Sequence, residues 1–160
     1  MRTIKIGVII LVLFTLYSCF GYAPPGPKTL PDILLKEMSG NHINLRNYQN
    51  NILIINFWAT WCGPCKEEIP DLNELHDSFK KNGVIILGIT SDRKEDVELF
   101  LKNHPVRYPI FIDAEQAEDA FSVSGYPMTY FYNAQGQLFT QAFGRRDKSF
   151  FEETISQMLK

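Results

Sequence analysis

The residues best suited to chemistry are two cysteines three positions apart, Cys62 and Cys65, with Gly63 and Pro64 between them. Two thiols at this spacing can close a disulfide or contribute to a metal site. A structural zinc site would need a second pair of ligands, but the chain has only one further cysteine, and its three histidines form no His-x3–5-His pair. The motif therefore predicts a redox-active dithiol that needs no metal and no organic cofactor.

The elements around the motif place Cys62 where a strand ends and a helix begins. The apolar run 51–58 is short enough for a strand that is buried on both faces. Beyond it, apolar side chains recur at the spacing of a helix, at Cys65, Ile69, Leu72, Leu75 and Phe79. Backbone N–H groups and the positive end of the helix dipole would face the first thiol and favour its thiolate. We therefore expect Cys62 to be the nucleophile.

The run Trp61-Cys62-Gly63-Pro64-Cys65-Lys66 after an apolar strand resembles a thioredoxin active site. Over residues 34–159 the chain resembles the membrane-tethered TlpA/ResA-type thioredoxin-like reductases. The resemblance implies a thioredoxin-like α/β fold, with a central mixed β-sheet flanked by helices on both faces and an N-terminal β-hairpin. It implies thiol–disulfide exchange, in which Cys62 attacks from an exposed position and the more buried Cys65 resolves the mixed disulfide. Trp61, Gly63 and Pro64 are expected on the substrate face.

An acidic residue follows the dithiol in a Cys-x-x-Cys-x-x-Glu-x-Pro pattern. Glu68 lies one helical turn past Cys65, and the resemblance implies that it sets the thiol pKa values and moves protons. The alternative is that Glu68 only places a negative charge in the first turn of the helix. True thioredoxins use a buried aspartate two residues before the strand tryptophan, but this chain has Asn56 there, which cannot titrate.

A second motif lies about sixty residues further along, where Pro127 immediately precedes a strand-like run. The resemblance implies a cis proline at this place, facing the dithiol, with the preceding backbone pairing with a bound peptide beside Cys62. Tyr126 is then the residue before the cis proline and part of the substrate site. Its bulk is expected to restrict access.

The rest of the chain alternates strand and helix patterns, as a parallel α/β unit does. A hairpin of 33–38 with 43–45 comes first, and the strands expected after the dithiol helix are 83–90, 108–112, the run 128–132 after Pro127, and the edge strand 138–143. The capping-box-like pair of Asp92 and Glu95 predicts the start of a helix that Pro105 stops. A short helix is expected over 115–121. The closing helix is expected to bury Phe151, Ile155, Met158 and Leu159.

Residues 1–23 are typical of a targeting segment, with Arg2 and Lys5 before an apolar stretch over 6–17. The following Leu16-Tyr17-Ser18-Cys19 resembles a bacterial lipoprotein cleavage box, which makes Cys19 the expected lipidation site. The alternatives are an uncleaved membrane anchor and ordinary signal cleavage. All three place the protein in the cell envelope, outside the cytoplasm. Residues 24–31 predict a proline-rich linker without a core, and residues 32–160 the thioredoxin-like domain.

The chain has 160 residues and a formal net charge of −2, with no basic patch, so nucleic acid is excluded as a partner. Gly-Pro between the cysteines resembles thioredoxin, whose potential near −270 mV favours a reductant. The resemblance then implies a membrane thiol-electron donor and disulfide-containing extracytoplasmic protein substrates, for example in cytochrome c maturation. The alternatives are a disulfide oxidase or isomerase, and a copper-binding assembly module, although such modules use Cys-x-x-x-Cys. Two cysteines in one helical turn do not fit a peroxidase.

Overall fold

The structure is a computed structural model, and it describes residues 24–160. The predicted targeting segment 1–23, with the lipidation site Cys19, lies outside the described residues. Within them, no helix is both long enough and apolar enough to cross a membrane.

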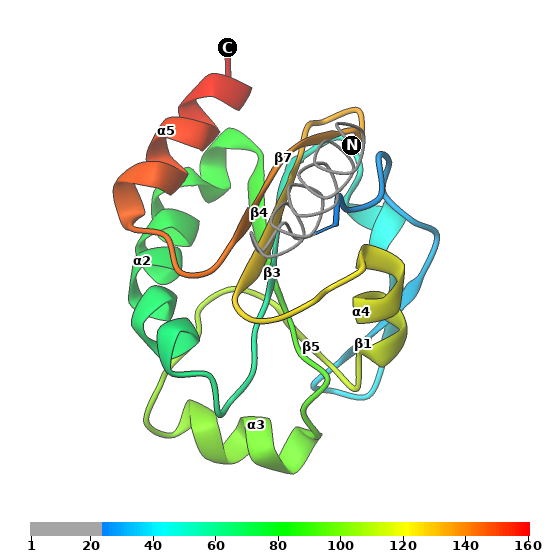
Figure 1. The fold of residues 1–160 in the computed structure, drawn as a ribbon, viewed down its shortest axis with the longest axis vertical. Coiled ribbons are helices and arrows are strands. Elements are labelled where there is room, and N and C mark those ends of the chain that lie inside the picture. The colour runs from blue at the N-terminus through cyan, green and yellow to red at the C-terminus, as the bar shows by residue number, and fades with distance from the viewer. Residues whose placement is uncertain (1–23) are drawn as a thin grey trace, which may run out of the picture.

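One mixed sheet of seven strands forms the centre of the described chain, in the order β2-β1-β5-β4-β3-β6-β7 (Figure 1). The strands are β1 (Leu34–Glu37), β2 (His42–Asn44), β3 (Ile52–Phe57), β4 (Val84–Ile89), β5 (Ile110–Ile112), β6 (Met128–Tyr132) and β7 (Leu138–Phe143). The helices are α2 (Gly63–Phe79), α3 (Lys94–Leu101), α4 (Glu115–Phe121) and α5 (Lys148–Met158), with short 3-10 turns at Leu45–Tyr48 and Lys80–Asn82. β3, β4 and β5 run parallel, and all other pairings are antiparallel.

Helices cover both faces of the sheet because β3 is apolar on both faces. Alternate side chains of a strand point to opposite faces. Ile52 and Ile54 pack with α2 and α5, whereas Leu53 and Phe57 pack with α4. In Figure 1, α2 and α5 accordingly lie on one side of β3 and β4, and α4 lies on the other. The predicted α/β architecture, a mixed sheet flanked by helices on both faces with an N-terminal β-hairpin, is confirmed.

The prediction that residues 24–31 form a linker without a core is wrong. Gly26 N donates to Gln141 Oε1 at 2.7 Å, and the Tyr132 hydroxyl donates to the Pro27 carbonyl at 2.7 Å. Leu30 is buried, and Thr29 forms a β-bridge with Gln137. The segment was interpreted from its proline-rich composition alone, but its backbone pairs with the start of β7: Leu138 N donates to the Lys28 carbonyl, and Leu30 N donates to the Gly136 carbonyl, both at 2.9 Å. Residues 26–31 therefore form a strap that belongs to the domain.

Replacing Gly26 with alanine is expected to destabilise the protein, because the strap packs closely against Tyr130 of β6. A Cβ atom at this position would lie 2.2 Å from Cε1 of Tyr130. That ring cannot easily move, because it is fully buried and its hydroxyl donates to the Phe121 carbonyl at 2.7 Å. Overpacking of this kind costs about 1–3 kcal/mol. Denaturant unfolding would measure the loss, and an unchanged free energy of unfolding would show that the strap is not held against β6.

Two further expectations about helix ends need correction. Arg93, not Asp92, is the N-cap of α3, and it makes no side-chain cap hydrogen bond. The Asp92 carboxylate is bound by the active-site loop instead, as described below. In α5 the buried residues are Phe151, Thr154 and Ile155, whereas Leu159 lies after the last helical residue and is exposed.

Candidate active site

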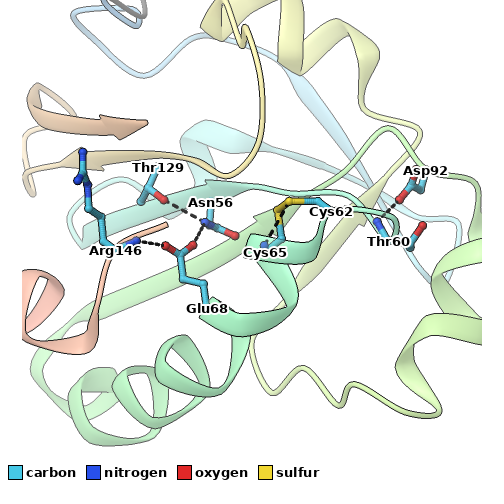
Figure 2. The surroundings of a disulfide bond; sticks show 8 residues. All are labelled: Asn56, Thr60, Cys62, Cys65, Glu68, Asp92, Thr129 and Arg146. Atoms are coloured by element: carbon cyan, nitrogen blue, oxygen red, sulfur yellow. Dashed lines mark hydrogen bonds between the residues drawn. A yellow bond between two sulfur atoms is a disulfide. The ribbon is translucent and has the colours of Figure 1, made fainter. Parts of the chain in front are cut away.

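Cys62 and Cys65 form a disulfide at the N-terminus of α2, with an S–S distance of 2.09 Å. Cys62 is the N-cap residue, and its sulfur accepts the backbone N–H of Cys65 at 3.2 Å (Figure 2). Pro64 lies in the first turn, where a missing N–H leaves no helical hydrogen bond unmade. The predicted junction of a buried strand and a helix is therefore where the dithiol lies.

Cys62 is less exposed than we expected. Only 5% of its surface is accessible, against 2% for Cys65, so the two differ little in this oxidised form. The Cys62 sulfur is bonded to Cys65 and accepts its N–H, which turns the side chain inward to an apolar cluster that includes Trp58 and Ile69. The exposed residues of the motif are Trp61, which is 70% accessible, and Gly63 and Pro64. Trp61 is therefore the large apolar side chain that the motif presents to solvent.

The loop before Cys62 is hydrogen-bonded to Asp92, a residue that follows the neighbouring strand β4. Thr60 N donates to Asp92 Oδ2 at 2.6 Å, and Cys62 N donates to the Ala59 carbonyl at 3.1 Å. Asp92 follows β4, which pairs in parallel with β3, so the carboxyl ends of both strands meet at one edge of the sheet. Figure 2 shows this contact beside the disulfide. Sequence reasoning missed Asp92 as a site residue because its spacing to Glu95 was interpreted as a helix cap.

Glu68 is buried below the dithiol, with only 1% of its surface accessible. Its Oε2 accepts from Asn56 Nδ2 at 2.9 Å, and its Oε1 accepts from the backbone N–H of Arg146 at 2.8 Å. Asn56 lies on the α2 face of β3, and its second amide proton goes to Oγ1 of Thr129, its cross-strand partner, at 2.9 Å. In the view of Figure 2, the Asn56 amide lies between the Glu68 carboxylate and the two cysteines.

Burial raises the pKa of Glu68 from 4.5 to about 7, and this effect outweighs the two N–H donors, which lower it. A carboxyl group with this pKa can both accept and release a proton near neutral pH. A charge meant only to stabilise the first helical turn would lie at the surface, as that of Glu67 does. The geometry therefore favours the proton-handling hypothesis over the simple helix-charge alternative.

The peptide bond between Tyr126 and Pro127 is cis, as the resemblance implied. The Tyr126 ring meets the edge of Trp61 at a centroid distance of 5.6 Å and packs against the apolar cluster that contains both cysteines. Its hydroxyl donates to Oε1 of Glu118, a residue of α4 that the sequence analysis did not single out. The fold thus brings the two predicted motifs together, although they lie about sixty residues apart in the sequence.

Gly63 and Pro64, predicted on the substrate face, lie in the first turn of α2 beside Cys62. Gly63 is exposed, and a Cβ atom there would meet nothing within 4 Å. In residues 24–160, no three His, Cys, Asp or Glu side chains gather as a metal site would require. Within that part of the chain, the arrangement offers a disulfide, a buried carboxyl group and an aromatic rim.

The AhpC/TSA family profile matches residues 27–140. The chain belongs to this family. It is 33% identical over 144 residues to the thiol-disulfide oxidoreductase ResA of Geobacillus kaustophilus, covering 86% of this chain and 83% of that protein. It is 28% identical over 162 residues to ResA of Bacillus subtilis, covering 96% and 90%. Among solved structures, it is similar to a putative thiol:disulfide interchange protein DsbE from Chlorobium tepidum, with a TM-score of 0.78, 26% identity, and coverage of 87% of this chain and all of that one.

These matches show a ResA-type, thioredoxin-like thiol-disulfide oxidoreductase, as the sequence resemblance implied. The similarity covers the dithiol, Glu68 and the cis proline, because all of them lie within the matched residues 27–140. The activity is therefore shown at the level of its reaction class.

Proposed function

We propose that this protein reduces disulfides in other proteins outside the cytoplasm, through the Cys62–Cys65 dithiol. The observation that supports this most directly is the dithiol at the N-terminus of α2, with the buried carboxyl group of Glu68 one turn away. A helix N-terminus favours the Cys62 thiolate, and Gly-Pro between the cysteines is the thioredoxin pairing. The first feature makes Cys62 a nucleophile, and the second favours a donor of electrons over an oxidant, because thioredoxin has a low potential near −270 mV.

The reaction would proceed in two displacements. The Cys62 thiolate attacks one sulfur of the substrate disulfide, forms a mixed disulfide, and releases the other substrate sulfur as a thiolate that takes up a proton. The Cys65 thiol then loses its proton and attacks the Cys62 sulfur. This step closes the Cys62–Cys65 disulfide and releases the second substrate thiol. Two electrons pass from the dithiol to the substrate, and a thiol donor must return them.

Glu68 would serve the second displacement as the proton acceptor for Cys65. The two residues are three positions apart on α2, so their side chains leave the helix on neighbouring parts of one face. Since Asn56 and the Arg146 N–H hold the carboxyl group in place, it cannot turn away to solvent. Trp61, Tyr126 and Pro127 would form the surface on which the substrate chain lies beside Cys62.

The proposed location is the cell envelope, with the protein tethered through lipidated Cys19 or an uncleaved anchor. A membrane thiol donor would then supply electrons, and the substrates would be extracytoplasmic proteins with disulfides, such as those of cytochrome c maturation. The relatives named ResA support the reaction class for this chain; the donor and the substrate are part of the proposal.

The redox state of the dithiol in living cells tests the direction of electron flow. Cells would be quenched with acid, and free thiols would be alkylated with a reagent that increases the protein mass. We expect a mostly reduced Cys62–Cys65 pair that becomes oxidised when the membrane donor is inactivated. A mostly oxidised pair that does not respond to loss of the donor would overturn the reductase proposal in favour of the oxidase alternative.

A further inference from the structure

The nucleophilic sulfur of this enzyme is covered. Cys62 must meet a substrate disulfide, yet only 5% of its surface is accessible. Two aromatic side chains lie around the dithiol at the surface, Trp61 from the loop before it and Tyr126 from the loop before β6. Their rings meet edge to face with an interplanar angle of 70°. We call this Trp61–Tyr126 pair the aromatic rim.

Within residues 24–160, only Tyr126 of the aromatic rim makes a side-chain hydrogen bond. Tyr126 donates its hydroxyl to Oε1 of Glu118. Burial, and then the hydrogen bond to Glu118, raise the pKa of the Tyr126 hydroxyl, so it remains a donor throughout the physiological range. The Trp61 ring contacts the Tyr126 ring, and on the side of α3 it borders an open hollow with Leu99. The position of the aromatic rim therefore depends on Glu118.

Glu118 lies on a helix that is firmly attached to the sheet. The neighbouring residue Ala117 and the last helical residue, Phe121, are buried. The Phe121 ring packs 5.1 Å from that of Tyr130, and the Phe121 carbonyl accepts the Tyr130 hydroxyl at 2.7 Å. Because Tyr130 belongs to β6, the strand that follows Pro127, α4 and the Tyr126 loop share one rigid support. Glu118 thus has a fixed position from which to hold the Tyr126 hydroxyl.

We propose that Glu118 is a positioning residue for thiol–disulfide exchange: it holds Tyr126 against Trp61, so that the aromatic rim shields Cys62 from small disulfides and presents a preformed surface to protein disulfides. This inference rests on the proposed role of Cys62 as the nucleophile. It assigns to α4 a function in substrate selection. A substrate protein would pack on the aromatic rim, whereas a small reagent gains nothing from it.

The test compares Glu118→Ala, which removes the hydrogen-bond acceptor, with Glu118→Gln, which keeps an acceptor oxygen at the same distance from the backbone. Glu115→Ala is the matched control, because it removes the same charge from the same helix at an exposed position. Two rates would be measured for the reduced proteins, with a small aromatic disulfide and with insulin. The reduction potential and the melting temperature would be measured alongside.

We expect Glu118→Ala to react about three- to tenfold faster with the small disulfide and to show a higher KM for insulin, as the loss of one typical intramolecular hydrogen bond predicts. Glu118→Gln should remain close to the wild type, and the reduction potential should stay unchanged in all variants. If Glu118→Ala matches Glu115→Ala in both rates, or changes only the melting temperature, the positioning role is wrong. If the wild type fails to exchange with either disulfide, the proposed function itself fails.

Discussion

Replacing Cys65 with alanine is expected to convert the enzyme into a trap for its own substrates. Cys62 would still attack a substrate disulfide, but no second thiol would be present to attack the Cys62 sulfur and release the product. Turnover with insulin should fall by roughly a thousandfold or more, since a partner in a concerted catalytic unit is lost. Covalent complexes of the variant with cellular proteins should appear on non-reducing gels and disappear with dithiothreitol, and mass spectrometry would identify the trapped partners.

The matched control is Cys62→Ser, which should lose the same activity and trap nothing, because the attacking sulfur is absent. Complexes formed by Cys62→Ser but not by Cys65→Ala would reverse the assignment of the two cysteines. Burial alone does not decide between them, since both are covered in the disulfide form. The assignment depends on the position of Cys62 as the N-cap residue of α2, where helix N–H groups favour a thiolate.

Glu68→Gln is expected to give the second-largest effect, on the pH dependence of catalysis. If Glu68 accepts the Cys65 proton, its loss should lower the rate at pH 7 by about a hundredfold or more, in line with general acid–base catalysis. The rate should recover at high pH, where the Cys65 thiol ionises without assistance. The measurements are kcat/KM for insulin from pH 5 to pH 9 and a titration of the thiols by ultraviolet absorbance. Together they would separate proton transfer by Glu68 from unassisted ionisation of the Cys65 thiol.

The same substitution should change how stability depends on pH. The pKa of Glu68 is about 7 in the fold, against an ordinary 4.5, so between these values the folded protein holds a proton that the unfolded chain has released. The free energy of unfolding of the wild type therefore falls as the pH rises through this window, by on the order of 3 kcal/mol. Glutamine does not titrate, so the stability of the variant relative to the wild type should rise from pH 5 to pH 8.

Glu67→Gln provides the control for both measurements. It removes one negative charge from the neighbouring position of α2, but the Glu67 side chain is exposed and paired only with Arg145. It should leave the pH–rate profile and the pH dependence of stability near those of the wild type. Equal effects of Glu67→Gln and Glu68→Gln would mean that general electrostatics, and not proton transfer by Glu68, account for the change.

The parts of the fold that repeat a strong local pattern were predictable from sequence. The buried run of β3 and the three-to-four spacing of α2 fix where Cys62 and Cys65 lie, and the short helix expected over 115–121 is α4 (Glu115–Phe121). β3 is a continuous apolar run, and α2 and α4 bury apolar side chains at helical spacing, so the sequence pattern and tertiary packing favour the same structure.

The predictions failed where a side chain binds residues that are distant in the sequence. Asp92 has the spacing of a helix cap to Glu95, but its carboxylate binds Thr60, 32 residues away. Glu118 was not singled out from the sequence, yet it accepts the Tyr126 hydroxyl. The strap was interpreted as a linker because proline-rich composition does not reveal that a neighbouring edge needs hydrogen-bond partners. No local pattern encodes such contacts, since they depend on which segments the fold brings together.

The strap also limits how far the enzyme can work from its proposed anchor. Just before the strap, the Pro24 carbonyl accepts from Gln141 Nε2, and Cys19 lies only five residues before Pro24 in the chain. Five residues span at most about 18 Å even when fully extended. With a lipid on Cys19, the domain would remain in a thin layer next to the bilayer and meet a membrane donor by lateral diffusion, at a high effective concentration. Electron delivery would then be fast for an abundant donor in the same membrane, and freely diffusing substrates would have to come to the membrane surface to be reduced.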